Sequence, residues 1–225
     1  MAAERIDTLG ALASRLLAAH DARPPTAADP PRPARTVVAV AGAPGSGKTT
    51  LATELLAALG ERAVEATVVP MDGFHLDDAQ LAPAGLLPRK GSPPTFDVGG
   101  LRATLARIAG DEERVYVPLF DRERELARAA AGVVEAHHRL VIVEGNYLLL
   151  DRRPWNSLAP LFDLSILLEV PEPILRERLL ERWLGFGFDA TEAERRAEEN
   201  DLPNGALVRE GSAVPDLLFV SARPL

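Results

Sequence analysis

Apolar residues in this chain gather into short, nearly continuous runs that alternate with segments of helical spacing. Five runs predict core strands, and they cover residues 37–41, 63–70, 140–145, 164–170 and 216–220. Such runs are typical of parallel strands that helices cover on both faces. A shorter run at residues 115–118 is a further strand candidate. The pattern therefore predicts an α/β fold.

Between these runs, apolar residues recur with the period of an amphipathic helix. Residues 4–19 predict an N-terminal helix that packs its apolar stripe on the domain. Gly60 marks the end of the helix that follows residue 50. Asp97 precedes another helical stripe, where it could act as an N-cap or as a ligand-binding residue. Helices between strands predict three layers around a central, mainly parallel five-stranded sheet with right-handed crossovers.

The C-terminal third predicts a group of helices. Pro171 and Glu172 suit the first turn of one helix, and residues 185–188 break it. Residues 191–194 have capping-box spacing and predict a second helix, whereas residues 200–204 (Asn-Asp-Leu-Pro-Asn) predict a polar turn. We expect three parts, an N-terminal helix with a Pro-rich connector, a main α/β domain and a lid inside it, at residues 1–35, 36–225 and about 176–200.

Composition narrows the class of protein. The 225 residues suit one α/β domain, and the absence of cysteine excludes disulfides and thiolate chemistry. A formal net charge of -8 argues against nonspecific nucleic-acid binding. No apolar run approaches the roughly 18 residues of a membrane span, and the N-terminus lacks a signal-peptide core. We expect a cytoplasmic enzyme with a small-molecule substrate and no nucleic-acid or membrane partner. A homodimer remains open.

A phosphate-binding loop lies between the first predicted strand and the helix that follows it. Two glycines stand there with the required spacing before a Lys-Thr pair. Backbone amides at a helix N-terminus favour an anion, while the lysine neutralises phosphate and the threonine hydroxyl binds magnesium. The predicted ATP-binding residues are Gly42, Ala43, Pro44, Gly45, Ser46, Gly47, Lys48, Thr49 and Thr50.

Carboxylates at two other strand ends distinguish phosphoryl transfer from simple nucleotide binding. Asp72 follows the second core strand and is the candidate base for an acceptor hydroxyl. Its alternative role is to stabilise a turn before Gly73. Glu144 ends a later strand and would lie near magnesium if that strand neighbours the first. An N-cap or solvated turn residue is the alternative.

Two arginines four residues apart, Arg178 and Arg182, share one helix face before the glycine-containing break. In a lid they would reach the transferred phosphate and exclude water. Surface pairing with Glu177 and Glu181 is the alternative. A GTPase is disfavoured, because no Asn-Lys-x-Asp sequence is present and no Asp-x-x-Gly directly follows a core strand.

Taken together, the motifs resemble those of the P-loop kinases that include uridine kinase, phosphoribulokinase and bacterial type I pantothenate kinase. The resemblance spans about Val37 to Phe219. It is carried by residues 42–49, Met71-Asp72-Gly73-Phe74, Arg89-Lys90-Gly91, Phe96-Asp97, Val117-Pro118-Leu119-Phe120, Val143-Glu144-Gly145, the Arg182 helix and residues 200–204.

The resemblance implies ATP with Mg²⁺ and phosphorylation of an alcohol. It makes Asp72 the catalytic base and Arg182 the lid arginine, with Lys48, Thr49 and Glu144 at the ATP and magnesium positions. Arg178 joins the ATP-binding residues. It implies that Asn204 contacts the acceptor, and the other candidate acceptor contacts are Asp72, Phe74, His75, Lys90, Phe120 and Arg122.

Departures from pantothenate kinase leave the acceptor open. Phe120 and Arg122 stand where that enzyme has a tyrosine and a histidine, and Leu179 replaces a lid tyrosine. Bacterial members described as nucleoside kinase-like or fructose-transport-associated kinases resemble the chain most. We expect a kinase for a sugar, nucleoside or related metabolite. Pantothenate kinase or phosphoribulokinase proper is one alternative. Another is an ATP-binding regulatory or transport-associated protein with little transfer activity.

Overall fold

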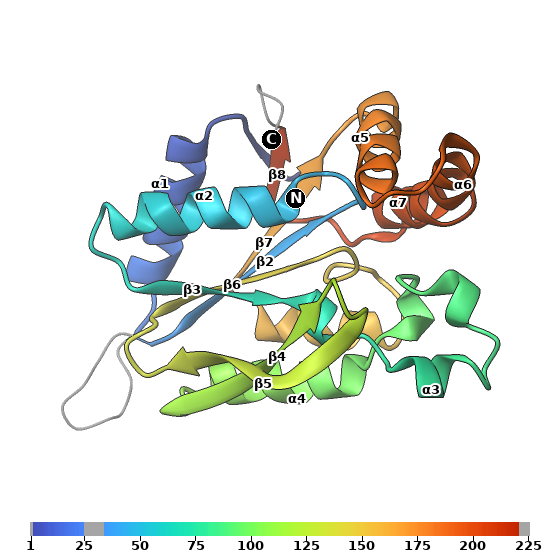
Figure 1. Ribbon diagram of the computed structural model, residues 1–225. Coiled ribbons are helices and arrows are strands. Elements are labelled where there is room, and N and C mark those ends of the chain that lie inside the picture. The colour runs from blue at the N-terminus through green and yellow to red at the C-terminus, as the bar shows by residue number, and fades with distance from the viewer. Residues whose placement is uncertain (1, 25–33, 221–225) are drawn as a thin grey trace.

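The computed structural model of the protein describes residues 2–24 and 34–220, and its centre is a six-stranded parallel sheet (Figure 1). Residues 25–33 of the expected Pro-rich connector lie outside the described part. The strand order is β1-β8-β7-β2-β6-β3. The strands are β1 (Glu4–Ile6), β2 (Thr36–Gly42), β3 (Ala66–Pro70), β6 (Leu140–Gly145), β7 (Leu164–Glu169) and β8 (Leu217–Val220).

The five predicted core strands are all in this sheet, and a sixth, β1, is added at its edge. The prediction of a helix from residue 4 was therefore wrong at its start, because Glu4, Arg5 and Ile6 pair in parallel with β8. Helix α1 (Leu9–Asp21) begins later, where the Thr8 hydroxyl accepts a hydrogen bond from the Ala11 amide. Its apolar stripe packs in the core, as expected.

Helices cover both faces of the sheet (Figure 1). On one face, α1 and α2 (Lys48–Gly60) pack on Val38 and Val40 of β2. On the other, α4 (Val98–Ala109) and a 3-10 segment (Trp155–Leu161) pack with Val37 and Ala39. Alternate residues of one strand thus enter different cores, as the pleat requires. Asp97 caps α4, accepting a hydrogen bond from the Gly100 amide at 2.8 Å.

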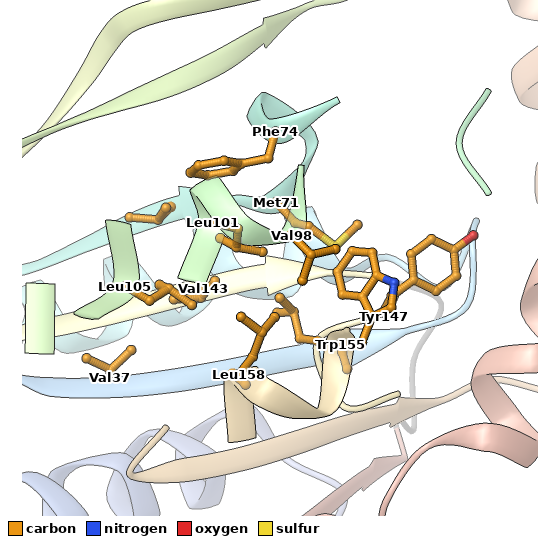
Figure 2. Packing of buried hydrophobic residues seen from close by; sticks show 14 of the residues in the cluster. Val37, Met71, Phe74, Val98, Leu101, Leu105, Val143, Tyr147, Trp155 and Leu158 are labelled. Carbon is orange, nitrogen blue, oxygen red and sulfur yellow. The ribbon is translucent and has the colours of Figure 1, made fainter. Parts of the chain in front are cut away.

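The core on the α4 face is rich in aromatic side chains. Figure 2 shows Trp155 and Tyr147 side by side, and their ring centroids lie 5.3 Å apart. Phe96 meets both rings edge-on. Buried apolar side chains of this size each contribute about 1.5–3 kcal/mol of transfer free energy. This core supports the strand ends on which the candidate site is built.

A separate antiparallel hairpin consists of β4 (Arg114–Asp121) and β5 (Leu126–Glu135). It crosses the lower side of the molecule in Figure 1. The predicted strand at 115–118 lies inside β4, whereas β5 was not predicted. Its Leu-Ala-Arg-Ala-Ala-Ala sequence lacks polar–apolar alternation, so pairing with β4 determines its conformation. The register shifts between Val117 and Leu119, at Pro118.

Three helices gather beside the end of β2: α5 (Glu172–Gly185), α6 (Ala190–Arg196) and α7 (Leu202–Gly211) (Figure 1). The cap of α6 is Asp189, not Thr191, since Asp189 accepts from the Glu192 amide. The polar turn predicted at 200–204 is also absent, because a π-helical turn (Ala197–Asp201) continues directly into α7. Across residues 2–24 and 34–220, no helix has the length and apolar character needed to span a bilayer.

Short segments complete the described chain between β3 and α4. A 3-10 turn, Met71–Phe74, directly follows β3. It leads to α3 (Asp78–Leu81) and to two further 3-10 turns, Leu87–Arg89 and Pro93–Thr95. An isolated bridge between His75 and Phe96 ties the two ends of this connection together.

Candidate functional site

The loop from Gly42 to Thr49 joins the end of β2 to the start of α2. Gly45 and Gly47 have left-handed backbone angles, with φ of 77° and 90°. Glycine adopts these angles without steric cost, and Gly47 forms the N-cap of α2. The conformation leaves amides at a helix N-terminus for an anion, as a phosphate-binding loop requires.

Close packing holds this loop in place. A Cβ on Gly45 would lie 3.2 Å from the Leu179 side chain of α5, and one on Gly42 would lie 3.2 Å from Leu168 of β7. A Cβ on Gly205 of α7 would lie 3.3 Å from Ala43. The loop therefore has neighbours on three sides. In the described chain, the buried Ser46 hydroxyl has no hydrogen-bond partner.

Lys48, at the first turn of α2, is buried and donates from Nζ to the Ala43 carbonyl at 3.0 Å. Burial lowers the pKa of Lys48, and the carboxylates of Glu144 and Asp72 oppose that shift. An ammonium folded back along the loop can exchange this one carbonyl for phosphate oxygens. The geometry thus suits a phosphate-binding lysine.

Glu144 lies beside the loop because β6 pairs with β2, with Glu144 opposite Val40. Thr49 Oγ1 donates to Glu144 Oε1 at 3.3 Å. Burial raises the pKa of Glu144, while Lys48 lowers it. The hydroxyl and carboxylate oxygens fit Mg²⁺, which binds few protein ligands and keeps waters or phosphates. The described residues include no cluster of three or more His, Asp and Glu side chains suited to a metal.

Asp72 lies in the 3-10 turn after β3, next to the strand that carries Glu144. Pro70 is opposite Glu144 in the β3–β6 register, so both carboxylates lie at one edge of the sheet. The Asp72 Oδ2 atom accepts a hydrogen bond from Arg122 Nη2 at 3.1 Å. Gly73 touches the hairpin backbone, since a Cβ there would stand 2.1 Å from the Pro118 carbonyl oxygen.

The other predicted acceptor contacts divide into two groups. His75, Phe120 and Lys90 lie together: the two rings are 4.8 Å apart, and Lys90 Nζ is 5.5 Å from the Phe120 ring. Burial lowers the pKa of His75, and Asp72 opposes this shift. Lys90 also donates to Asp78 and to the Glu125 carbonyl. Phe74, in contrast, packs in the apolar core shown in Figure 2.

The two arginines of α5 face the loop and its neighbouring helices. Arg178 Nη1 lies 3.4 Å from the carbonyl oxygens of Gly45 and Ser46. Arg182 Nη2 donates to Asp201 Oδ2 at 3.0 Å. Neither guanidinium uses Glu177 or Glu181 for these bonds. Arg178 therefore lies against the phosphate loop, and Arg182 is near enough for its charge to lower the pKa of Lys48.

Asn204 lies in the first turn of α7 and is buried. Its side-chain amide donates to Asn200 at 3.2 Å, and Asn200 in turn donates to the Lys90 carbonyl at 3.1 Å. This chain of bonds connects α7 with the loop that carries the acceptor-side lysine.

Sequence reasoning missed several polar residues around this site. The Tyr147 hydroxyl donates to the Gly91 carbonyl at 2.7 Å, and burial raises the pKa of Tyr147. Trp183 Nε1 donates to Asp201 Oδ2 at 2.7 Å. Asp201 lies in the stretch that was predicted to be a polar turn. A prediction of helix there would have indicated a side chain that points toward α5. Helical spacing predicted Trp183 on the apolar side of its helix but not this bond, and no spacing rule indicated Tyr147.

The chain has the arrangement of a P-loop nucleotide-binding protein, with a phosphate loop at the end of a central parallel strand and an acidic side chain on the neighbouring strand. It belongs to the phosphoribulokinase / uridine kinase family, whose model matches residues 37–182. Membership makes the chain a phosphotransferase that uses ATP.

Three relatives show the extent of the similarity. A crystal structure described as a "putative fructose transport system kinase" from Silicibacter sp. TM1040 is 45% identical, with a TM-score of 0.86, over 94% of this chain and 98% of that one. YggC of Escherichia coli is 39% identical over 82% of this chain and 77% of that protein. The "putative uridine kinase C227.14" of Schizosaccharomyces pombe is 34% identical over 84% of each.

Proposed function

We propose that the protein is a Mg²⁺-dependent kinase that transfers the γ-phosphate of ATP to a hydroxyl of a sugar, nucleoside or related metabolite. One observation carries the proposal: Asp72 lies at the same sheet edge as Lys48 and Glu144. Its charge acts on the pKa of both groups. A carboxylate so close to a phosphate loop serves acceptor activation, whereas nucleotide binding alone does not require it.

In the proposed reaction, the acceptor hydroxyl gives its proton to the Asp72 carboxylate as its oxygen attacks the γ-phosphorus. The bond from that phosphorus to the bridging oxygen breaks in line, and ADP leaves with the electron pair. Lys48 and Arg182 stabilise the negative charge on the transferred group. Thr49 and Glu144 would hold Mg²⁺, which supplies charge neutralisation across the β- and γ-phosphates when it is bound.

The acceptor is expected between the Met71–Phe74 turn and the hairpin. Arg122 and His75 lie next to Asp72, and Phe120 packs on His75. A flat aromatic surface beside charged groups suits a ring that carries several hydroxyls. The names of two relatives refer to fructose transport and uridine, which is consistent with a sugar or nucleoside.

Residues of about 176–200, in α5 and α6, are proposed to act as a lid. Arg178 and Arg182 belong to this segment, and Leu179 packs on Gly45 of the phosphate loop. A segment with these contacts would close over ATP, exclude water and bring guanidinium groups to the phosphates.

The experiment compares the wild type with Asp72→Asn, which keeps the shape of the side chain but cannot accept the proton. Sugars, nucleosides and pantothenate are screened for acceptor-dependent ADP release. Turnover of the variant should fall by about 10²- to 10⁴-fold while ATP affinity is retained. Asp151→Asn, at an exposed residue outside the site, is the matched control.

Two outcomes would contradict the proposal in different ways. Near-normal turnover of Asp72→Asn on the true acceptor would exclude Asp72 as the base. ATP binding without acceptor-dependent ADP release across the screen would favour a regulatory or transport-associated ATP-binding protein.

A further inference from the structure

Helix α5, helix α6 and the π-helical turn meet around one indole ring, that of Trp183. Two guanidinium groups lie over this ring, Arg182 and Arg196, each 4.9 Å from its centroid. Phe186 and Phe188 meet it edge-on at 5.8 and 5.7 Å. The ring therefore fixes the position of its neighbours, including the proposed catalytic arginine.

Asp201 supplies the carboxylate at the centre of this arrangement. Only 10% of its side chain is exposed, and its Oδ2 atom accepts from both Trp183 Nε1 and Arg182 Nη2. The indole N–H cannot change its charge or rotate independently of the ring, so it holds the carboxylate in one place. Arg196, the other guanidinium over the ring, is paired with Glu192 at 2.7 Å. The negative charge of Asp201 is thus available to Arg182.

Asp201 holds the Arg182 side chain through only one nitrogen of the guanidinium. Its Nη2 atom bonds Asp201, whereas its Nε atom is buried without a hydrogen-bond partner in the part of the chain that the structure describes. A buried donor without an acceptor costs free energy, which an incoming acceptor atom relieves. A guanidinium offers its donors as a planar fork that matches phosphate oxygens. The contact with Asp201 therefore leaves donors for a phosphate.

The π-helical turn explains how Asp201 reaches this position. Residues 197–201 form this turn, which continues without interruption into α7. Single π turns add one residue to a helix and occur frequently at functional sites. On the exposed side, Arg176 of α5 pairs with Glu194 of α6 and with Glu198 of the π-helical turn. These outer pairs join the same helices but do not contact Arg182.

We propose that Asp201 is a positioning residue that orients Arg182 toward the γ-phosphate of ATP. This inference rests on the proposed function, because it assigns Arg182 to the transferred phosphate. Trp183 fixes the Asp201 carboxylate, which fixes one terminal nitrogen of Arg182. The remaining donors of the guanidinium are then already oriented toward the phosphate, so little rotamer freedom is lost when ATP binds.

A double-mutant cycle tests the proposal with wild type, Asp201→Asn, Arg182→Gln and the double variant. Asp201→Asn keeps an acceptor for the indole but removes the charge. It should lower kcat by about 10- to 100-fold, the usual loss for a supporting partner of an active-site group, with little change in KM. In the Arg182→Gln background the same substitution should change kcat by less than about twofold, because the effect acts through Arg182.

A second readout needs no acceptor. Arg182 contacts the γ-phosphate in this proposal, so the ratio of ATP to ADP affinity should fall in Asp201→Asn and in Arg182→Gln, without a further fall in the double variant. Glu210→Gln, which removes an exposed carboxylate of α7 outside the proposed lid, is the control and should leave both readouts unchanged. Thermal unfolding verifies that each variant is folded.

The outcomes separate this inference from the proposed function. An equal loss of kcat in both backgrounds would assign Asp201 a merely structural role, and an unchanged kcat and affinity ratio would also overturn the inference. If the wild type transfers phosphate to no acceptor, the proposed function fails. The nucleotide affinity ratio still tests the Asp201–Arg182 coupling in that case.

Discussion

The donor and acceptor sides of the candidate site are constructed differently. The donor side is a contiguous loop, largely buried, whose shape depends on backbone angles at Gly45 and Gly47 and on packing by three elements. The acceptor side consists of side chains from separate segments, and the Arg122 side chain is 60% exposed. A site that binds its ligand through backbone groups tolerates few sequence changes. A site built from exposed side chains can change its ligand by substitution of those side chains.

This difference explains why one family can keep its donor and change its acceptor. Backbone amides and a buried lysine recognise phosphate, which is common to every reaction of the family. In the proposed function, the hairpin and the turn after β3 recognise the acceptor. The following predictions test this separation between the two sides.

The largest effect is expected on the donor side. Lys48→Met keeps the length of the buried side chain but removes its charge, so turnover should fall by about 10²- to 10³-fold. Because the lysine serves the phosphates, the loss should be the same for every acceptor that the protein uses. Steady-state kinetics with two unlike acceptors measures this, and a loss that depends on the acceptor would contradict the separation.

A smaller and more selective effect is expected on the acceptor side. Arg122→Gln removes the charged partner of Asp72, and we expect about a tenfold rise in acceptor KM, since this bond is charge-assisted but solvent-exposed. ATP KM should not change. Arg124→Gln, at a neighbouring exposed hairpin position, is the control. An equal change in the KM of both substrates would show that Arg122 serves the donor as well.

The smallest effect is expected from pH. Burial lowers the pKa of His20, next to the donor-side strand β2, and of His75 on the acceptor side. Below about pH 6.5 these two histidines therefore bind more protons in the unfolded chain than in the folded chain, and their contribution to stability falls as the pH falls. Each histidine contributes at most about 1.4 kcal/mol per pH unit.

Denaturant unfolding between pH 7.5 and 5.5 measures this slope. His20→Gln and His75→Gln should each flatten it, and the donor-side and acceptor-side contributions are obtained by difference. If neither substitution altered the slope, these histidines would not be the groups responsible.

Much of the fold could be predicted because its signals are local. The apolar runs of the five core strands and the glycine spacing of the loop are visible in short windows. Strand β1 could not be predicted, because Glu4 and Arg5 are polar and three residues give no periodicity. Strand β5 and the π turn depend on pairing and helix packing far along the chain. Tertiary contacts determined these elements where local propensity did not.

The same contrast applies to the candidate site. Strand adjacency brought Glu144 to Thr49, as the α/β pattern predicted. The network of Asp201, Trp183 and Arg182 was missed, because its members meet only after the chain reverses between α5 and α6. Asn204 was predicted from the family resemblance, and its burial on α7 next to the loop could not be read from the sequence.

The absence of a side chain at Gly73 has a consequence for how specificity can change. Because the Pro118 carbonyl packs so closely on Gly73, the turn that carries Asp72 and the hairpin that carries Arg122 move together as one rigid unit. A mutation that reshapes the hairpin for a larger acceptor also moves the base. New specificities should therefore arise through paired changes in the turn and the hairpin, and redesign of the acceptor site would have to vary both together.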